Sequence, residues 1–214
     1  MAAGRSSTAN SGSRTARRLN LTRAERADLV RRRLFDSAVK VVGQHGYAEA
    51  TVARITKLSG VAQGTFYNHF SSRQDLLDQL LPVIGQQMLE FIRTRVAGIA
   101  DPAILEVARF RAFFDFLLET PQFMRILNEA QLFAPAGYAK HMETVSKNYM
   151  RALRRDGVAD GLSDKELEVV TQVLMGARSY LSQRFSYTNN TVHAPDEAVF
   201  TAYEKLVRHG LFGG

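Results

Sequence analysis

The sequence predicts an all-α fold of about nine helices, with a small three-helix unit near the N-terminus followed by a larger helical unit. Apolar residues recur at spacings of three and four over most of the 214 residues, and the alternation of a half-buried strand persists nowhere. Helix-start signals and prolines punctuate this pattern. No apolar run approaches the ~18–20 residues of a membrane helix, so we expect a soluble globular protein.

The first 20 residues form a basic arm that we expect to be disordered in isolation. They are rich in Ser, Ala, Thr, Gly and Arg and contain no acidic side chain. A first helix then begins at Thr22, because Thr22 and Glu25 have the spacing of a capping box. It runs to the glycines of region 43–46. Its buried stripe is expected to consist of Leu34, Ala38, Val41 and Val42.

Residues 51–70 predict two short helices joined by a tight turn, which is a helix-turn-helix. Thr51 suits an N-cap, because its hydroxyl can accept a hydrogen bond from a free backbone N–H group at the helix start. Gly60 permits the left-handed backbone that ends a helix and turns the chain. The first helix of the pair is expected to face a small core through Val52, Ile55 and Leu58.

The second helix of this pair has two contrasting faces. Phe66 and Phe70 stand four residues apart and are expected to point inward together. The opposite face then carries small or hydrogen-bonding residues, which are Gln63, Gly64, Thr65, Tyr67 and Asn68. Such groups suit base edges and phosphates, so this helix is a candidate for the DNA major groove.

Positive charge is concentrated in the same part of the chain. The sequence carries 28 Lys and Arg against 21 Asp and Glu, a formal charge of +7. Residues 1–80 hold 13 basic and 6 acidic side chains, whereas residues 81–214 hold 15 of each. A single basic run is commonly a solvated face without a partner. Because the whole excess coincides with the helix-turn-helix, it predicts a nucleic-acid partner.

The remaining helices are marked by caps and prolines. A fourth helix is expected to begin at Ser71 or Ser72 and to continue toward Gly98. Pro82 lies inside it and predicts either a kink between two domains or a helix break, since proline removes one backbone hydrogen bond. The later starts are Asp101-Pro102, Thr120-Pro121, Pro135, the capping box of Ser163 and Glu166, and Pro195, with a polar loop at 186–194 and a last helix ending near His209.

A specific set of residues within region 28–80 matches a known family. These residues are Thr51, Ile55, Ser59-Gly60-Val61, Gly64-Thr65-Phe66-Tyr67, His69-Phe70, Ser72-Arg73 and Leu76-Leu77. In this order they resemble the tetracycline-repressor (TetR) type of transcriptional regulator. The resemblance implies a DNA-binding domain at 21–80 and a helical effector-binding and dimerisation domain at 81–214. It also implies a dimer that binds a palindromic double-stranded operator, and we expect this dimer to act as a repressor. Because no N-terminal signal is visible and the chain has no cysteine, we expect a cytoplasmic protein.

The resemblance also assigns roles on the DNA-binding surface. It places Gln63 and Thr65 on bases, while Thr51, Tyr67, His69 and Arg73 hold phosphates, with Asn68 on the same surface. The chemistry agrees, because hydroxyls suit backbone oxygens and an amide can meet adenine with two hydrogen bonds. His69 has a structural alternative, in which it packs toward the first helix. The arm at 1–20 either follows DNA into the minor groove or is a passive leader.

Enzyme chemistry, a metal site and a cofactor are not expected. The five histidines contain no pair with the four-residue spacing of a helical zinc motif, and the chain has no cysteine. The sequence also lacks a phosphate-binding glycine loop after a strand and the Gly-x-Ser-x-Gly motif of a serine hydrolase.

The larger unit predicts either a packed core or an adaptable ligand cavity, because residues 88–150 are rich in aromatics and methionine. Polar residues such as Glu129 and Arg111 stand among the apolar ones, and buried polar groups must be paired by protein or by ligand. We expect an apolar effector with one polar or anionic end, bound between the fourth and eighth helices. The candidate effector residues are Phe91, Arg109, Phe113, Asn128, Tyr149 and Arg178.

Two apolar stripes near 165–185 and 195–211 predict a homodimer through a four-helix bundle. The stripes consist of Val169, Val170, Val173, Leu174, Ala177 and Leu181, and of Val199, Phe200, Tyr203, Leu206, Val207 and Leu211. The alternative is that both stripes are buried within one chain. Two other functions also stay open, a DNA-binding protein of this fold that acts through protein partners without an effector, and an all-helical ligand carrier.

Overall fold

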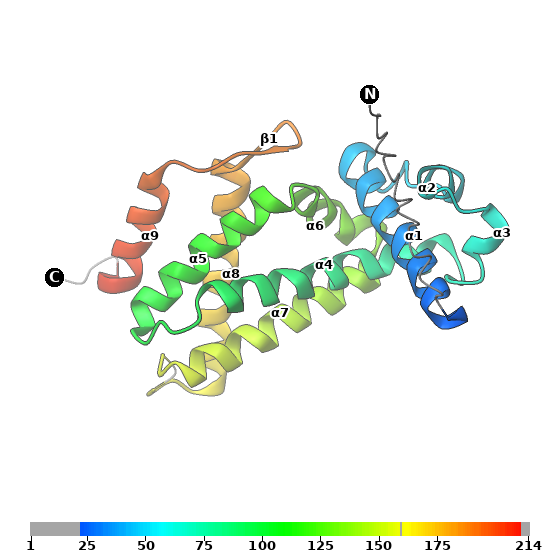
Figure 1. Ribbon diagram of the computed structural model, residues 1–214. Helices are drawn as coiled ribbons and strands as arrows, with labels where there is room; N and C mark the ends of the chain where they lie inside the picture. Colours follow the sequence, from blue (N-terminus) through cyan, green and yellow to red (C-terminus); the bar gives the residue numbers. More distant parts are fainter. Residues whose placement is uncertain (1–21, 159, 211–214) are drawn as a thin grey trace, which may run out of the picture.

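The computed structural model describes residues 22–158 and 160–210, and in these ranges it contains nine helices and one short hairpin (Figure 1). The all-α prediction is confirmed. The elements are α1 Arg23–His45, α2 Val52–Ser59, α3 Gln63–Phe66, α4 Arg73–Arg95, α5 Pro102–Glu119, α6 Gln122–Phe133, α7 Pro135–Arg155, α8 Asp164–Phe185, β1 Tyr187–Thr188, β2 Thr191–Val192 and α9 Glu197–His209. The predicted basic arm at 1–20 lies outside the described residues.

Most helices begin where the capping signals place them. Both capping boxes form, and in each the cap side chain accepts from the third helical N–H while the glutamate accepts from the cap backbone. Ser72 caps α4 by accepting a hydrogen bond from the backbone of Asp75. Two starts differ from the prediction by one or two residues. Pro121 is the residue before α6, and α9 is capped by Asp196 rather than opened by Pro195.

The polar loop predicted at 186–194 contains an antiparallel hairpin. Tyr187 pairs with Val192, and Thr188 pairs with Thr191. Asn189 and Asn190 make the turn with φ of 53° and 61°. Positive φ at both central residues is the geometry of the tight turns that match the strand twist, and asparagine tolerates it. Strands of two residues are too short to show alternation, so sequence analysis missed them.

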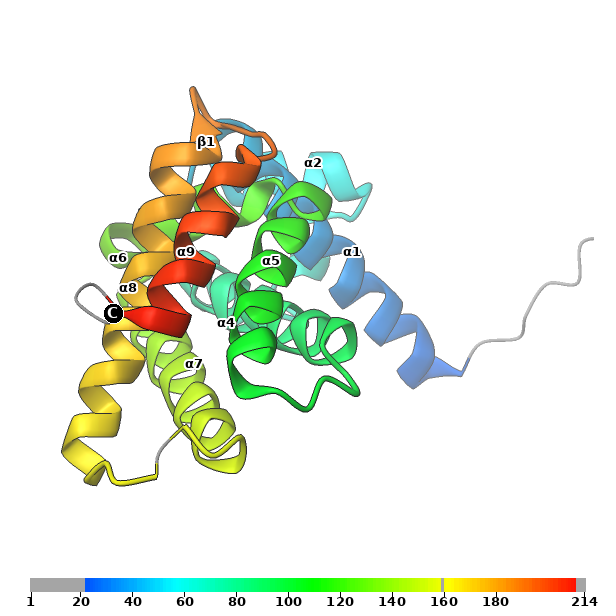
Figure 2. The ribbon, with the colours of Figure 1, turned by 90° about the vertical axis from the view of Figure 1, so that its left-hand side faces the viewer.

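The helices form two units joined by α4, which runs from one into the other (Figure 1). The smaller unit consists of α1, α2 and α3, and the larger one of α5 to α9. Helices α4 and α7 lie side by side over most of their length, and α9 packs along α5 (Figures 1 and 2). Pro82 lies inside an unbroken α4, so the predicted helix break does not occur.

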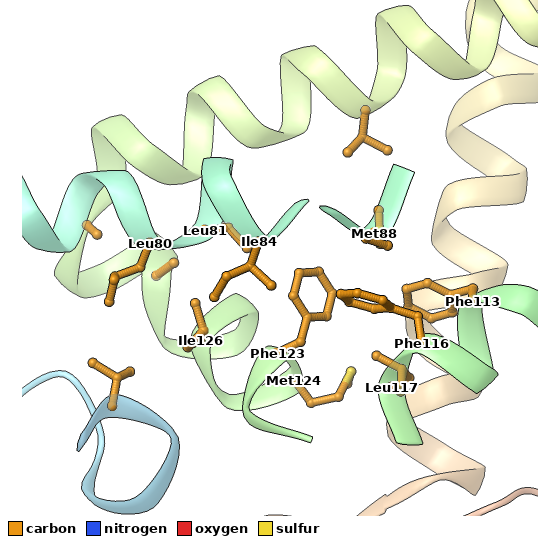
Figure 3. Close-up of a cluster of buried hydrophobic side chains, with 14 of the residues drawn as sticks. Leu80, Leu81, Ile84, Met88, Phe113, Phe116, Leu117, Phe123, Met124 and Ile126 are labelled. Atoms are coloured by element: carbon orange, nitrogen blue, oxygen red, sulfur yellow. The ribbon is translucent and has the colours of Figure 1, made fainter. Parts of the chain in front are cut away.

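One apolar core extends through both units. Leu34 and Ile55 of the smaller unit are fully buried, as are Leu80 and Leu81 on either side of the predicted boundary at residue 80. Figure 3 shows Leu80, Leu81 and Ile84 of α4 against Ile126 and Phe123 of α6. A shared core means that α6 and the first unit are packed together rather than linked by a free hinge.

One predicted core residue is exposed. Leu58 was expected to face the core of the helix-turn-helix, but it is 52% exposed, whereas Ile55 is fully buried. The buried face of α2 runs through Ile55, Thr56 and Ser59 instead, so Leu58 points away from the core. None of the helices in the described ranges is long and apolar enough to span a bilayer.

Candidate functional site

The helix-turn-helix has the geometry that its residues predict. The Thr51 hydroxyl accepts a hydrogen bond from the backbone N of Arg54 at 3.2 Å and caps α2. Gly60 ends the helix in the left-handed region at φ 65°. Phe66 and Phe70 are buried with ring centroids 5.5 Å apart. These two rings hold the second helix of the pair against the core, so its opposite side faces outward.

The outward side of α3 is polar and accessible. Gln63, Tyr67 and Asn68 are exposed, with Tyr67 at 59%, and Thr65 is half-buried. Helix α3 is a single turn, and the chain continues it as hydrogen-bonded turns in which the N of His69 donates to the carbonyl of Phe66 at 3.0 Å. Four of the predicted DNA-contact residues therefore lie on one accessible surface. We call the residues Gln63, Thr65, Tyr67 and Asn68 the reading surface.

Arg73 has structural contacts that its sequence position did not indicate. Its Nε donates to the carbonyl of Ala50 at 2.9 Å and its Nη2 to the carbonyl of Tyr47 at 2.5 Å, and the side chain is half-buried. A guanidinium that is committed to backbone carbonyls serves first to fix the loop before α2. Arg73 thus positions the loop of the helix-turn-helix, and its predicted phosphate contact stays a prediction.

His69 is half-buried, and its backbone carbonyl accepts from the Nη1 of Arg31 in α1 at 2.9 Å. The backbone of His69 therefore has a structural contact with α1, which fits the alternative that this residue packs toward the first helix. Its predicted phosphate contact stays a prediction.

The larger unit contains an apolar cavity of about 350 Å³, lined by α4, α5, α6, α7 and α8. We call it the apolar cavity. Three of the predicted effector residues, Phe113, Asn128 and Arg178, line it. Its remaining lining is Met88, Phe123, Leu127, Gln131, Tyr138, His141, Met142, Val145, Gln172, Met175, Gly176, Ser179 and Gln183. This volume lies near the lower end of the ~300–1,000 Å³ that is typical of small-molecule sites.

The other three predicted effector residues lie elsewhere. Phe91 does not line the apolar cavity, because its ring packs on Phe116 with centroids 5.7 Å apart and lies under the guanidinium of Arg95. Arg109 and Tyr149 instead line a second cavity of about 480 Å³. We call this one the basic cavity, after Arg93, Arg109, Arg155 and Arg178, which line it. Arg178 and Val145 line both cavities.

A buried carboxylate that the sequence analysis did not single out organises this region. Glu106 of α5 is 4% exposed, and its Oε1 accepts hydrogen bonds from the hydroxyls of Tyr149 and Tyr203. The Nη2 of Arg178 lies 3.6 Å from the same oxygen. In the sequence, Glu106 stands in an apolar run of α5, and Arg109 follows it three residues later. This pair of opposite charges among apolar residues could have indicated a buried ion pair.

His141 of α7 lines the apolar cavity and lies against α4. It is 5% exposed, and burial lowers its pKa to about 4, so the imidazole is neutral at physiological pH. A Cβ atom at Gly85 would overlap the imidazole, so the absence of a side chain at Gly85 allows α7 to approach α4. The cavity wall and α4, the helix that enters the smaller unit, are thus in direct contact.

Helix α6 also joins the cavity to the smaller unit. One of its faces contributes Phe123, Leu127 and Asn128 to the cavity wall. Its other face carries Arg125, whose Nη1 donates to the carbonyl of Gln44 at 2.9 Å, and Glu129, which was predicted to be an embedded polar residue. The carboxylate of Glu129 contacts the backbone of the loop after α1. A twelve-residue helix therefore touches both sites.

The predicted dimer stripes divide between the inside and the outside of the subunit. Phe200 and Tyr203 of α9 are buried, and Tyr203 stacks on Phe110 of α5 at 3.8 Å, so these two pack within the subunit. On α8, Val173 is 62% and Tyr180 70% exposed. Val169, Val173, Gly176 and Tyr180 share one exposed face of α8, which we call the α8 outer face. Leu211 lies outside the described residues.

Comparison with known proteins identifies the family. Residues 34–80 match the family described as "Bacterial regulatory proteins, tetR family". The chain is 34% identical over 70 residues to the fatty acid metabolism regulator protein of Bacillus subtilis, covering 33% of this chain and 34% of that protein. It is 30% identical over 91 residues to the transcriptional repressor DhaR of Mycobacterium sp., covering 42% and 44%. The match thus spans less than half of the length of these two relatives.

Solved structures share the fold over most of the chain. The fatty acid degradation regulator FadR from Bacillus halodurans superposes with a TM-score of 0.66 at 22% identity, over 86% of this chain and 97% of that one. FadR from Bacillus subtilis, in complex with stearoyl-CoA, superposes with a TM-score of 0.64 at 18% identity, over 84% and 98%. At these identities the likeness shows the fold alone. Residues 34–80 of this chain thus form the helix-turn-helix domain of the TetR family of bacterial regulatory proteins.

Proposed function

We propose that this protein is a transcriptional repressor that binds a palindromic operator as a homodimer and is released by a small amphipathic effector. The observation that carries this proposal is a physical connection within one chain. Helix α4 begins next to the reading surface, at Arg73, and continues without a break to Met88 in the wall of the apolar cavity. A ligand in the cavity can therefore alter the position of the DNA-reading helices.

The reading surface supports sequence-specific binding. Gln63 stands at the first position of α3, where an amide can reach adenine with two hydrogen bonds. The hydroxyls of Thr51 and Tyr67 suit phosphate oxygens on either side of the groove. Because one short helix contacts few base pairs, useful specificity requires two copies, and a two-fold axis demands inverted half-sites.

The α8 outer face supports the dimer. It combines two exposed β-branched residues and a large aromatic ring with Gly176, where an added Cβ atom would meet no heavy atom within 4 Å. Exposed apolar side chains on one helix face favour burial against a second copy. The α9 stripe contributes less than the sequence suggested, since Phe200 and Tyr203 are already buried against α5.

The apolar cavity supports an effector with an apolar body. Its aromatic and methionine side chains form an adaptable wall, and Asn128, His141 and Arg178 supply polar groups. Two similar proteins are consistent with such an effector. One relative is a fatty acid metabolism regulator, and one structural neighbour was solved in complex with stearoyl-CoA. We therefore place this chain among regulators that respond to an acyl compound or a molecule of similar shape.

Selection from random duplexes, followed by native mass spectrometry, tests the operator and the dimer together. We expect an inverted repeat to be enriched and bound by two copies, or by a multiple of two. Val173→Glu in the α8 outer face should yield monomers and weaken operator binding, while Leu132→Glu, at an exposed leucine of α6, should do neither. Enrichment of a lone asymmetric half-site, or a dimeric Val173→Glu protein, would contradict the proposal.

A further inference from the structure

The basic cavity adjoins the apolar cavity inside the larger unit. It lies between the C-terminal halves of α4 and α7, the first turns of α5, and α8. Both cavities have Val145 and Arg178 in their walls. These two side chains therefore mark the place where the two spaces come closest together.

The two cavities differ in charge. The wall of the apolar cavity contains no carboxylate, and Arg178 is its one Lys or Arg residue among the described ranges. The wall of the basic cavity contains four arginines and two carboxylates, Glu90 and Asp156. Both carboxylates are already paired, Glu90 with Arg93 at 2.6 Å and Asp156 with Arg109 and Arg155. The wall of this cavity therefore carries more positive than negative charge.

Arg178 is incompletely paired. It is 9% exposed, and its Nη2 donates to the hydroxyl of Tyr149 at 3.2 Å. Its Nε is buried and has no hydrogen-bond partner in the described structure. The nearest carboxylate oxygen, on Glu106, lies 3.6 Å from Nη2 and already accepts from two tyrosine hydroxyls. A buried donor without an acceptor costs free energy, and an anionic ligand group would remove this cost.

We propose that the basic cavity holds the anionic head of the effector while its apolar chain passes Val145 into the apolar cavity. This inference rests on the proposed function and specifies its ligand as an anionic amphipath, either a fatty carboxylate or the thioester of one. Arg178 is then the residue that determines head-group specificity. Its position in both walls places its guanidinium at the junction of head and chain.

Ligand affinities measured by calorimetry on the full chain test this assignment. The probes are dodecanoate, dodecanol, dodecanoyl-CoA and CoA alone, together with octanoate and decanoate. We expect dodecanoate or dodecanoyl-CoA to bind, with affinity rising about fourfold for each added methylene until the chain fills the apolar cavity. Binding of dodecanoate identifies a carboxylate head, and binding of dodecanoyl-CoA alone identifies a phosphate-bearing one. Both outcomes support the inference.

Arg178→Gln should weaken binding of the anionic probe at least about tenfold and change dodecanol binding less than about threefold, since a charge-assisted contact is lost. Arg155→Gln, at an exposed rim arginine, should weaken the anion by about threefold. Its matched control is Arg151→Gln, one turn earlier on α7, at an exposed arginine that lines neither cavity. If Arg178→Gln does not fold, the pair on α7 still decides the question.

The inference is overturned if dodecanol binds as tightly as dodecanoate and dodecanoyl-CoA, or if Arg155→Gln and Arg151→Gln behave alike. It is also overturned if affinity does not depend on chain length. Operator binding without ligand is measured on the same samples. A protein that binds an inverted repeat but ignores every anionic probe would sink this assignment and leave the DNA-binding proposal standing. Loss of operator binding in the unmodified protein would instead count against the proposed function.

Discussion

A hydrogen bond between Glu129 and the backbone of Tyr47 links the two units of the subunit. The Oε2 of Glu129, in α6, accepts from the backbone N of Tyr47 at 2.8 Å, across 82 residues of sequence. The Oε1 of the same carboxylate accepts from the Nε of Arg125 at 2.7 Å. The loop that holds Tyr47 is also fixed by Arg73, so α6, this loop and the start of α4 form one connected structure.

Glu129→Ala should reduce the coupling between effector and operator. In the proposed function the effector weakens DNA binding by a coupling free energy that is typically ~1–3 kcal/mol, and we expect this difference to fall by about half. Unfolding by urea should show a loss of about 1–2 kcal/mol, since the part-buried N–H of Tyr47 loses its acceptor. Operator titrations with and without ligand measure the coupling.

Glu143→Ala is the control for that change, because Glu143 forms an exposed pair with Lys147 on α7 and does not touch the DNA-binding unit. It should leave both the coupling and the stability unchanged. Full coupling in Glu129→Ala would show that α4 alone connects the two sites.

Gln63→Ala should lower operator affinity by roughly 1–3 kcal/mol and relax the sequence preference at one base pair of each half-site. Tyr67→Phe removes a hydroxyl from the same surface and should weaken all sequences by similar factors, as expected for a phosphate contact. Titration of single-base operator variants separates the two patterns. A uniform loss for Gln63→Ala would contradict its assignment to a base.

Arg73→Lys separates the positioning role from a phosphate contact. Lysine keeps the charge but cannot donate to the carbonyls of Ala50 and Tyr47 in the same fork geometry. We expect a loss of about 1–3 kcal/mol in the free energy of unfolding and an unchanged salt slope of DNA binding. If Arg73→Lys leaves the free energy of unfolding unchanged and makes DNA binding less dependent on salt, Arg73 contacts a phosphate.

DNA binding should depend steeply on salt, and part of the slope should come from residues 1–20. With roughly 6–10 phosphates neutralised per dimer, affinity should fall on the order of a thousandfold or more between about 50 and 200 mM salt. Deletion of residues 1–20 removes Arg5, Arg14, Arg17 and Arg18 and should flatten the slope while the dimer persists. An unchanged slope after deletion would identify the arm as a passive leader.

Protonation of His141 should destabilise the protein in mild acid. Burial lowers its pKa from 6.5 to about 4, so the unfolded chain binds the proton more tightly. The stability is fully present above the unfolded pKa and is lost as the pH falls from about 6.5 to about 4. The loss should reach about 2 kcal/mol at about pH 5 relative to about pH 7.

Urea unfolding at both pH values measures this loss, and His141→Gln should reduce it. The exposed His193→Gln provides the control and should leave the pH dependence as it is. An identical pH dependence in all three proteins would show that other groups cause the acid sensitivity.

The local features of this protein follow from the sequence alone. The capping boxes at Thr22 and Ser163, the left-handed turn at Gly60 and the inward pair Phe66 and Phe70 each depend on residues within four positions of one another. Short-range hydrogen bonds and helical periodicity decide such features before the chain folds. This is why the helix order and the reading surface could be predicted.

The features that join distant segments required the tertiary structure. The guanidinium of Arg73 donates to carbonyls of the loop at 47–50, a proximity that sequence spacing does not encode. Phe91 is a large aromatic residue of the type that commonly lines a ligand cavity. In the structure its ring packs on Phe116 instead. Arg178 was a predicted polar anchor, but its pairing with Tyr149 and Glu106 spans three helices. Burial and the partners of a charged group are decided by packing, because each partner comes from a segment far away in the chain.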